Sequence, residues 1–266
     1  MIYLYCNKDV LTFFIDYINS LLFNYNDKLL LTTDINELNG ENPIIFIQNI
    51  PCEFNMINIK KSKIFILNTE QIYRDIIKDF INNLDKDINI IDYSLSNISL
   101  VENKSILYLP YLINRNEILN YEKPNDIAVI GDWESEYRRI IKQNIELKTK
   151  INLVEGFDKE RDEFLFRHKI LLNIHYDKNY KIFEQFRCNR CILNNITEKS
   201  QDVDFELKDF IIECDYTDIV TTTIYILENY EYFYNKLFSN FDIELINYKY
   251  KLISDKFFEE LSKRID

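Results

Sequence analysis

Short apolar runs alternate with amphipathic stretches along the first 120 residues of the chain. The runs have the length of buried strands and are flanked by polar residues, whereas the stretches between them place apolar side chains at helical spacing. Strands that alternate with helices predict a parallel sheet in an α/β domain. The expected strands are 2–5, 44–47, 64–67, 88–91 and 106–109, and the expected helices are 10–23 and 71–83.

The same alternation begins again after a polar segment at residues 114–125. We therefore expect two domains, 1–120 and 121–266, which fits a chain of 266 residues. The expected strands of the second domain are 126–130, 151–154, 170–174 and 210–212, and its expected helices include 158–168, 217–237 and 254–264.

The stretch from Lys169 to Ser200 shows the sharpest change from apolar to polar residues in the chain. An apolar strand at 170–174 runs into a polar loop at 175–178, and a helix that carries Glu184 and Arg187 follows. In open α/β sheets ligands bind outside the carboxyl ends of the strands, beside helix N-termini that attract anions. This loop is therefore the predicted ligand site.

Two further signals each have a structural as well as a functional interpretation. Gly131 follows a strand and precedes a helix that carries Arg138, which is the layout of a phosphate-binding βα unit, but a lone glycine is a weak motif. Glu184 and Arg187 are suited to bind a hydroxyl and a diphosphate, respectively. As an ordinary i,i+3 ion pair they would contribute only about 0.3 kcal/mol.

Composition excludes several classes of protein. The net charge is −12 and no stripe of Lys or Arg is present, so nucleic acid is not expected as a partner. No apolar run is long enough for a transmembrane segment, and an odd number of scattered cysteines, 5 in all, predicts reduced thiols and a cytoplasmic protein. Cys188 and Cys191 lack a second pair at zinc spacing, so no metal site is predicted.

The run KILLNIHYDKNYKIFEQFR at 169–187, with CNRCILNN and later TEKS, resembles the C-terminal domain of a group of GT-B glycosyltransferases from bacteria and giant viruses. That group has a strand ending in Asn-Ile-His and Tyr or Phe, a helix beginning with Glu-x-x-Arg, and a strand ending in Ser-Glu. FILNTEQI at 65–72, IDYSLSNI at 91–98 and DIAVIGDWESEYRRI at 126–140 resemble other elements of the group, in order. The resemblance implies an α/β, GT-B fold: two Rossmann-like domains whose parallel sheets face a central cleft.

The resemblance also implies a nucleotide-sugar donor held mainly by the C-terminal domain, an acceptor-side N-terminal domain, no cofactor and no essential metal. His175 and Glu184 are the expected catalytic residues. The expected acceptor-side residues are Asn68 and Glu70. The expected donor-binding residues are Gly131, Arg138, Lys169, Tyr176, Arg187 and Glu198.

One departure from the family pattern leaves two functions open. Many relatives carry a glutamate where this chain has Arg190. The first hypothesis is a glycosyltransferase that moves a sugar to a hydroxyl of an unknown glycan, lipid or protein, in the host cytoplasm if the chain is viral. The alternative, which Arg190 favours, is a catalytically silent GT-B-like binding or scaffold protein. The sugar, and retention or inversion at its anomeric carbon, stay open.

Overall fold

The computed structural model describes residues 1–38, 40–47, 59–102, 105–119, 121–131, 134–144, 147–176, 182–194, 197–200 and 207–265, with only the backbone of 136, 158 and 197–200. Two compact units make up the chain. The N-terminal unit consists of Met1–Asn114 and Leu245–Asp266, and the C-terminal unit is Arg115–Glu244. Each unit contains a parallel sheet with helices, which confirms the α/β class predicted from the sequence.

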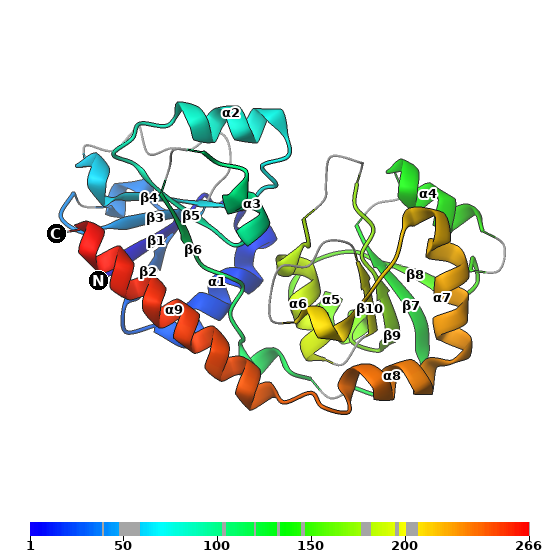
Figure 1. The fold of residues 1–266 in the computed structure, drawn as a ribbon. Coiled ribbons are helices and arrows are strands. Elements are labelled where there is room, and N and C mark those ends of the chain that lie inside the picture. The colour runs from blue at the N-terminus through cyan, green and yellow to red at the C-terminus, as the bar shows by residue number, and fades with distance from the viewer. Residues whose placement is uncertain are drawn as a thin grey trace. The chain divides into compact units, whose positions relative to one another are not determined.

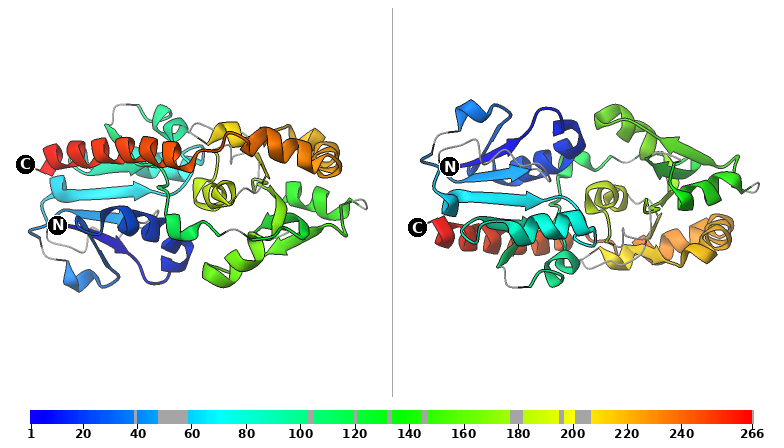
Figure 2. Two further views of the ribbon diagram at one scale, coloured as in Figure 1. Left: turned by 90° about the horizontal axis from the view of Figure 1, so that it is seen from below. Right: turned by 90° about the horizontal axis from the view of Figure 1, so that it is seen from above.

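The N-terminal sheet has six parallel strands in the order β2-β1-β3-β4-β5-β6 (Figure 1). Right-handed crossovers in opposite directions from its middle place helices on both faces. In both views of Figure 2, α1 (blue) and α9 (red) lie on opposite sides of the strands of this unit. The strands are β1 (Ile2–Cys6), β2 (Leu29–Thr32), β3 (Ile44–Ile47), β4 (Ile64–Asn68), β5 (Asn89–Asp92) and β6 (Ile106–Tyr108), and the helices are α1 (Leu11–Tyr25), α2 (Asp75–Asn83), α3 (Leu95–Ser99) and α9 (Ile243–Ile265).

Helix α9 packs mainly in the N-terminal unit, not in the C-terminal domain to which the sequence analysis assigned it. The Tyr25 hydroxyl at the end of α1 donates a hydrogen bond to Asp255 Oδ1 at 3.0 Å, and its ring lies 4.3 Å from that of Phe258. Near the end of α9, Arg264 donates to the Ser105 carbonyl at 3.2 Å. An amphipathic pattern identifies the apolar face of a helix but not the sheet that it covers.

The C-terminal sheet has five parallel strands in the order β11-β10-β9-β7-β8. Ile127 in β7 and Ile170 in β9 point to the same face, where they form a core with Ile141 of α4 and Ile226 of α7. Helices α5 and α6 lie on the other side of the sheet (Figure 1). The strands are β7 (Asn125–Ile130), β8 (Ile151–Val154), β9 (His168–Leu172), β10 (Thr197–Ser200) and β11 (Ile211–Glu213), and the helices are α4 (Glu136–Gln143), α5 (Asp158–Leu165), α6 (Gln185–Leu193), α7 (Ile219–Glu228) and α8 (Tyr230–Phe238).

The strand order of the C-terminal sheet reverses between β7 and β9. The chain leaves β7 toward β8 on one side and leaves β9 toward β10 on the other, which corresponds to the doubly wound order 2-1-3-4-5. In this order the loops part at the carboxyl ends of the first and third strands and leave a crevice for ligands. Val129 is paired with Leu172, so Gly131 and Ile174 reach this edge at the same level.

Candidate functional site

Arg138 and Gly131 form one side of the switch point in the C-terminal unit. Ser135 caps α4 by accepting a hydrogen bond from the Arg138 N–H at 3.1 Å. The buried Arg138 side chain turns back over the sheet, and its Nε donates to the Ile174 carbonyl at 3.2 Å. Gly131 has φ +109°, and a Cβ placed there would lie 2.6 Å from an Arg138 guanidinium nitrogen. Glycine is therefore required both by the backbone conformation and by the close approach of Arg138.

His175 forms the other side of the switch point, directly after the end of the β9 segment. Its ring is buried, 1% exposed, and neither ring nitrogen makes a well-aligned hydrogen bond within the described part of the chain, although the Ile182 backbone is close enough to affect its pKa. Burial lowers the pKa of His175, against smaller raising effects of Glu184 and the Ile182 backbone, and Arg187 and Arg138 lower it further. The imidazole is therefore neutral at pH 7, with one N–H donor and one acceptor nitrogen.

Glu184 and Arg187 lie at the start of α6 and interact electrostatically with His175. Arg187 donates to Glu184 Oε2 at 2.6 Å. The Glu184 and Arg187 side chains are 21% and 25% exposed, respectively. The pair is therefore more shielded from water than an ordinary i,i+3 ion pair on a helix surface. Four of the predicted residues, together with Gly131, are thus brought to the carboxyl ends of β7 and β9.

Tyr216 is a member of this group that the sequence analysis did not predict. It lies in a 3₁₀ turn, Tyr216–Asp218, after β11, and its hydroxyl accepts a hydrogen bond from the His175 backbone N–H at 2.9 Å. Its ring is stacked on Tyr137 of α4, with centroids 4.2 Å apart and planes at 5°. The available signal was its place after a strand's carboxyl end, where loop residues gather in a parallel sheet.

Three predicted donor-binding residues have different surroundings. Lys169 lies near the amino end of β9, where its Nζ donates to Asp126 Oδ1 at 2.9 Å, so the structure places it away from the switch point. Tyr176 follows His175 and is 46% exposed. Glu198 belongs to β10 between β9 and β11, and its side chain lies outside the described residues, as does the rest of the predicted loop, 177–178.

The predicted acceptor-side residues belong to a polar network in the N-terminal unit. The buried Asn68 side chain donates to Asp92 Oδ2 at 2.6 Å and to the Glu70 carbonyl at 2.8 Å. Asn97 donates to Asp92 Oδ1 at 3.0 Å, and the Glu70 carboxylate pairs with Arg74. These contacts join the loops after β4 and β5. They give Asn68 a structural role, and the acceptor role of Asn68 and Glu70 stays a prediction.

Arg190 of α6 forms a buried network of ion pairs. Its Nε donates to Glu117 Oε2 at 2.8 Å, and the rest of its guanidinium holds both carboxylate oxygens of Asp162. Asp162 also accepts from Arg161 at 2.9 Å, and the Arg190 guanidinium lies 5.5 Å from the centroid of the Phe166 ring. The departure from the family pattern at Arg190 therefore has structural partners of its own.

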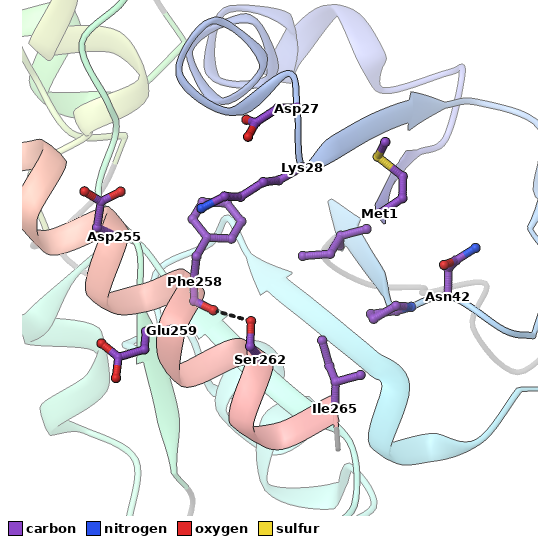
Figure 3. Close-up of a pocket in the computed structure, with 11 residues that line it drawn as sticks. Met1, Asp27, Lys28, Asn42, Asp255, Phe258, Glu259, Ser262 and Ile265 are labelled. Atoms are coloured by element: carbon purple, nitrogen blue, oxygen red, sulfur yellow. Dashed lines mark hydrogen bonds between the residues drawn. The ribbon is translucent and has the colours of Figure 1, made fainter.

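A separate cavity of about 600 Å³ lies in the N-terminal unit between α9 and the amino ends of β1 and β3 (Figure 3). Asp255 pairs with Lys251 at 2.9 Å and Glu259 with Lys263 at 2.8 Å, so two of its carboxylates already have cationic partners. Ligands of doubly wound sheets bind at the opposite edge, and the cavity is not the predicted site. Its lining residues are Met1, Ile2, Asp27, Lys28, Asn42, Pro43, Asp255, Phe258, Glu259, Ser262 and Ile265.

The cysteines and acidic side chains of the described ranges form no metal centre. Cys188 and Cys191 are free and buried in α6. Across the ranges that the structure describes, no group of three or more His, Cys, Asp or Glu side chains is arranged to hold a metal ion. In the same ranges, every helix is too short or too polar to cross a bilayer.

The chain is similar to several proteins of Acanthamoeba polyphaga mimivirus. It is 31% identical to protein L140 over 246 residues, which cover 83% of this chain and 78% of L140. It is 30% identical to protein R358 over 215 residues, 76% of this chain and 74% of R358. The chain belongs to the family of L140 and R358. Protein L137 is a longer member, in which the similar region, 30% identical, covers 33% of the length.

Two solved structures are similar in part to this member of the L140 family, and no established family model matches its sequence. TarM superposes with a TM-score of 0.48 at 12% identity over 88% of this chain and 58% of TarM. A chain of the glycosylation-associated protein complex Gap123 from Streptococcus agalactiae gives a TM-score of 0.42 at 14% identity, over 93% of this chain and 57% of its own. The chain thus spans less than two thirds of either protein.

Proposed function

We propose that this protein is a GT-B glycosyltransferase that binds a nucleotide-diphosphate sugar at the switch point of its C-terminal unit. The observation that carries the proposal is the convergence of Arg138, His175, Glu184 and Arg187 at the carboxyl ends of β7 and β9. The sequence resemblance to GT-B enzymes supports the choice of a sugar nucleotide over other anions.

In this proposal, Arg138 and Arg187 hold the diphosphate. A chain with a net charge of −12 repels anions overall, so binding depends on local cations at the site. A guanidinium has five N–H donors, and the contact with Glu184 occupies one nitrogen of Arg187, which leaves donors for phosphate oxygens. The backbone N–H groups at the start of α4 add a favourable field.

The reaction transfers the sugar from phosphate to the acceptor oxygen. The bond between the anomeric carbon and the diphosphate oxygen breaks, and its electron pair leaves with the diphosphate. The acceptor oxygen forms the new bond and gives its proton to Glu184 or to the departing diphosphate. Arg138 and Arg187 stabilise the charge that develops on the leaving group. His175, neutral because burial lowers its pKa, donates a hydrogen bond to the sugar rather than acting as a charged acid.

The catalytically silent alternative predicts the same binding without transfer. Its sequence support was Arg190, and the ion pairs of Arg190 with Glu117 and Asp162 supply a structural reason for that residue. We therefore favour the enzyme. The four cysteines of the described part, all free, are consistent with the reaction taking place in a reducing cytoplasm.

Calorimetry with nucleoside diphosphates and their sugars tests the proposal. Arg187→Ala removes a charge-assisted hydrogen bond to phosphate and is expected to weaken binding by about 1.5–3 kcal/mol, or about 10- to 150-fold. Lys169→Ala is the matched control, because it removes a cation from the other end of the same sheet. The nucleotide affinity of this variant should stay within about twofold of wild type.

Three outcomes separate the possibilities. A wild-type protein that binds none of these nucleotides contradicts the proposed function. Equal losses in the two variants point to a general effect of charge instead of a site at the switch point. Tight binding of a nucleotide-sugar that is neither hydrolysed nor transferred, in a screen of glycan, lipid and protein acceptors, supports the silent alternative.

A further inference from the structure

Tyr216 joins three segments of the C-terminal unit at one point. Its hydroxyl accepts a hydrogen bond from the His175 backbone N–H at 2.9 Å, and its ring is stacked flat on Tyr137, 4.2 Å away. The turn after β11 is thereby connected to the segment after β9 and to the first turn of α4. Arg138, the next residue of α4, holds the same segment through the Ile174 carbonyl.

The Tyr216 hydroxyl has a proton left to donate. A phenol has one O–H donor in addition to its acceptor lone pairs, and the contact with His175 uses a lone pair. Burial raises the pKa of Tyr216 to about 12, so the proton is retained at physiological pH. In the part of the chain that the structure describes, this proton has no acceptor.

The surroundings of this hydroxyl are those of the proposed donor site. Glu184 and Arg138 both interact electrostatically with Tyr216, and the same two residues act on His175. The side chain is only partly buried, which leaves it within reach of a ligand. Its ring stack alone does not account for the hydroxyl, because phenylalanine would stack equally well.

We propose that Tyr216 is a positioning and ligand-binding residue: its hydroxyl fixes the backbone of His175 and donates its proton to a phosphate oxygen of the bound nucleoside diphosphate. The positioning role stands on the contact with His175 alone, whereas the binding role rests on the proposed function. Tyr216 thereby adds a neutral donor to the two arginines that face the phosphates.

The first arm of the test needs no ligand. The chain has 2 histidines, so ¹⁵N-labelled imidazole signals report His175 and, as an internal reference, His168, which lies in β9 away from the loop. Tyr216→Phe keeps the ring and removes the hydroxyl. It is expected to shift the signals and the titration curve of His175, while those of His168 stay unchanged.

Tyr137→Phe is the matched control, since the Tyr137 hydroxyl makes no contact with the loop among the described residues. The charged groups that face His175 are Glu184, Arg187 and Arg138, and all three remain in both variants. Unchanged His175 signals in Tyr216→Phe would overturn the positioning role.

The second arm is calorimetry with inorganic pyrophosphate and with nucleoside diphosphates. Tyr216→Phe should bind both at least about 10-fold more weakly than wild type, as expected for a hydrogen bond to a charged group, and Tyr137→Phe should bind within about twofold. Equal affinities of the two variants overturn the ligand-binding role. If the wild-type protein binds neither probe, the proposed function fails together with this role, while the imidazole signals still decide the positioning role.

Discussion

In the N-terminal unit, Asn68, Asp92 and Asn97 bond to one another at the carboxyl ends of β4 and β5, whereas the His175 ring after β9 in the C-terminal unit has no such bond within the described ranges. Asp92 accepts from Asn68 at 2.6 Å and from Asn97 at 3.0 Å, all of them buried. His175 is equally buried, yet both of its ring nitrogens lack a hydrogen bond within the described ranges.

In our proposal, this difference distinguishes a structural network in the N-terminal unit from a binding site in the C-terminal unit. A buried polar group without a partner costs about 1–3 kcal/mol, so a closed network is the arrangement that stability favours. In our proposal, a ligand bound beside the two arginines supplies hydrogen bonds that the His175 ring does not make within the described ranges. The same sheet edge thus serves the fold in one unit and, in our proposal, the substrate in the other.

Arg190→Ala is the change with the largest expected effect, and it separates the two roles within α6. It leaves the carboxylates of Glu117 and Asp162 buried with fewer partners, and the expected loss of unfolding free energy is about 3–5 kcal/mol. Urea unfolding of the variant measures this loss. Nucleotide affinity of the folded variant should stay near that of wild type, and a stability loss below about 1 kcal/mol would contradict the structural role.

Asn68→Ala tests whether the network of the N-terminal unit is structural. The substitution leaves the Asp92 carboxylate and the Glu70 backbone without the hydrogen bonds that they make with Asn68. We therefore expect the free energy of unfolding, measured in urea, to fall by about 2–3 kcal/mol. With an acceptor identified, the KM of the folded variant for that acceptor is the control. A stable variant with a raised KM for the acceptor would instead show that Asn68 binds the acceptor, and the two units would then no longer differ in this respect.

Gly131→Ala tests the packing of the switch point. The new Cβ meets the Arg138 guanidinium in a backbone conformation with φ +109°, which is strained for alanine, and about 1–3 kcal/mol of stability should be lost. Displacement of Arg138 should also weaken diphosphate binding. Gly156→Ala is a control with φ +86° and open space around its Cβ, so it carries the strain without the collision. Equal nucleotide affinity in both variants would show that Arg138 is not held by Gly131.

The pH dependence of stability is the smallest of these effects and compares two buried histidines. Burial lowers the pKa of both His168 and His175. Below about pH 6.5 the unfolded chain takes up protons that the folded chain does not, so the unfolding free energy falls as the pH is lowered, by at most about 1.4 kcal/mol per pH unit for each histidine. Above about pH 6.5 both states are neutral and this contribution is flat.

Urea unfolding between about pH 5 and about pH 8, about 1.5 units on each side of the unperturbed histidine pKa, checks this slope in wild type, His168→Gln and His175→Gln. Each variant should reduce it. A saturating diphosphate should raise the pKa of His175 and leave that of His168 unchanged. If diphosphate raised the pKa of His168 and left that of His175 unchanged, His175 would not lie at the anion site.

Several elements of the fold could be predicted from the sequence because their signal is local. β3 and β8 have the predicted bounds, 44–47 and 151–154, since each is a short segment of mainly apolar residues with a clear local boundary at both ends. β2, at Leu29–Thr32, was missed: it is an edge strand of four residues in which Leu30 is 48% exposed. The predicted helix 217–237 is broken at Asn229, where φ is −117° and ψ is 33°.

The candidate site shows the same division. Gly131, Arg138, His175, Glu184 and Arg187 could be selected from their positions after strands and at helix starts, because loops at one edge of a parallel sheet converge. Tyr216 was missed although it follows a predicted strand, because it lies 41 positions from its partner His175 and shares no local pattern with it. Lys169 lies at the amino end of β9, away from the other predicted residues, which its sequence did not reveal because the amino and carboxyl ends of a short strand differ little in sequence.

The sequence by itself therefore determined most of the segments that form strands and helices, the succession of two α/β units, and the gathering of polar side chains after β7 and β9. These properties depend on hydrophobic periodicity and on local chain signals. Only the tertiary structure decided that α9 packs in the N-terminal unit and that Arg190 is held by Glu117 and Asp162. It also decided that Asn68 bonds to Asp92, while the His175 ring has no such partner among the described residues. Each of these depends on which distant side chains meet in the folded chain, and long-range contact of this kind has no period in the sequence.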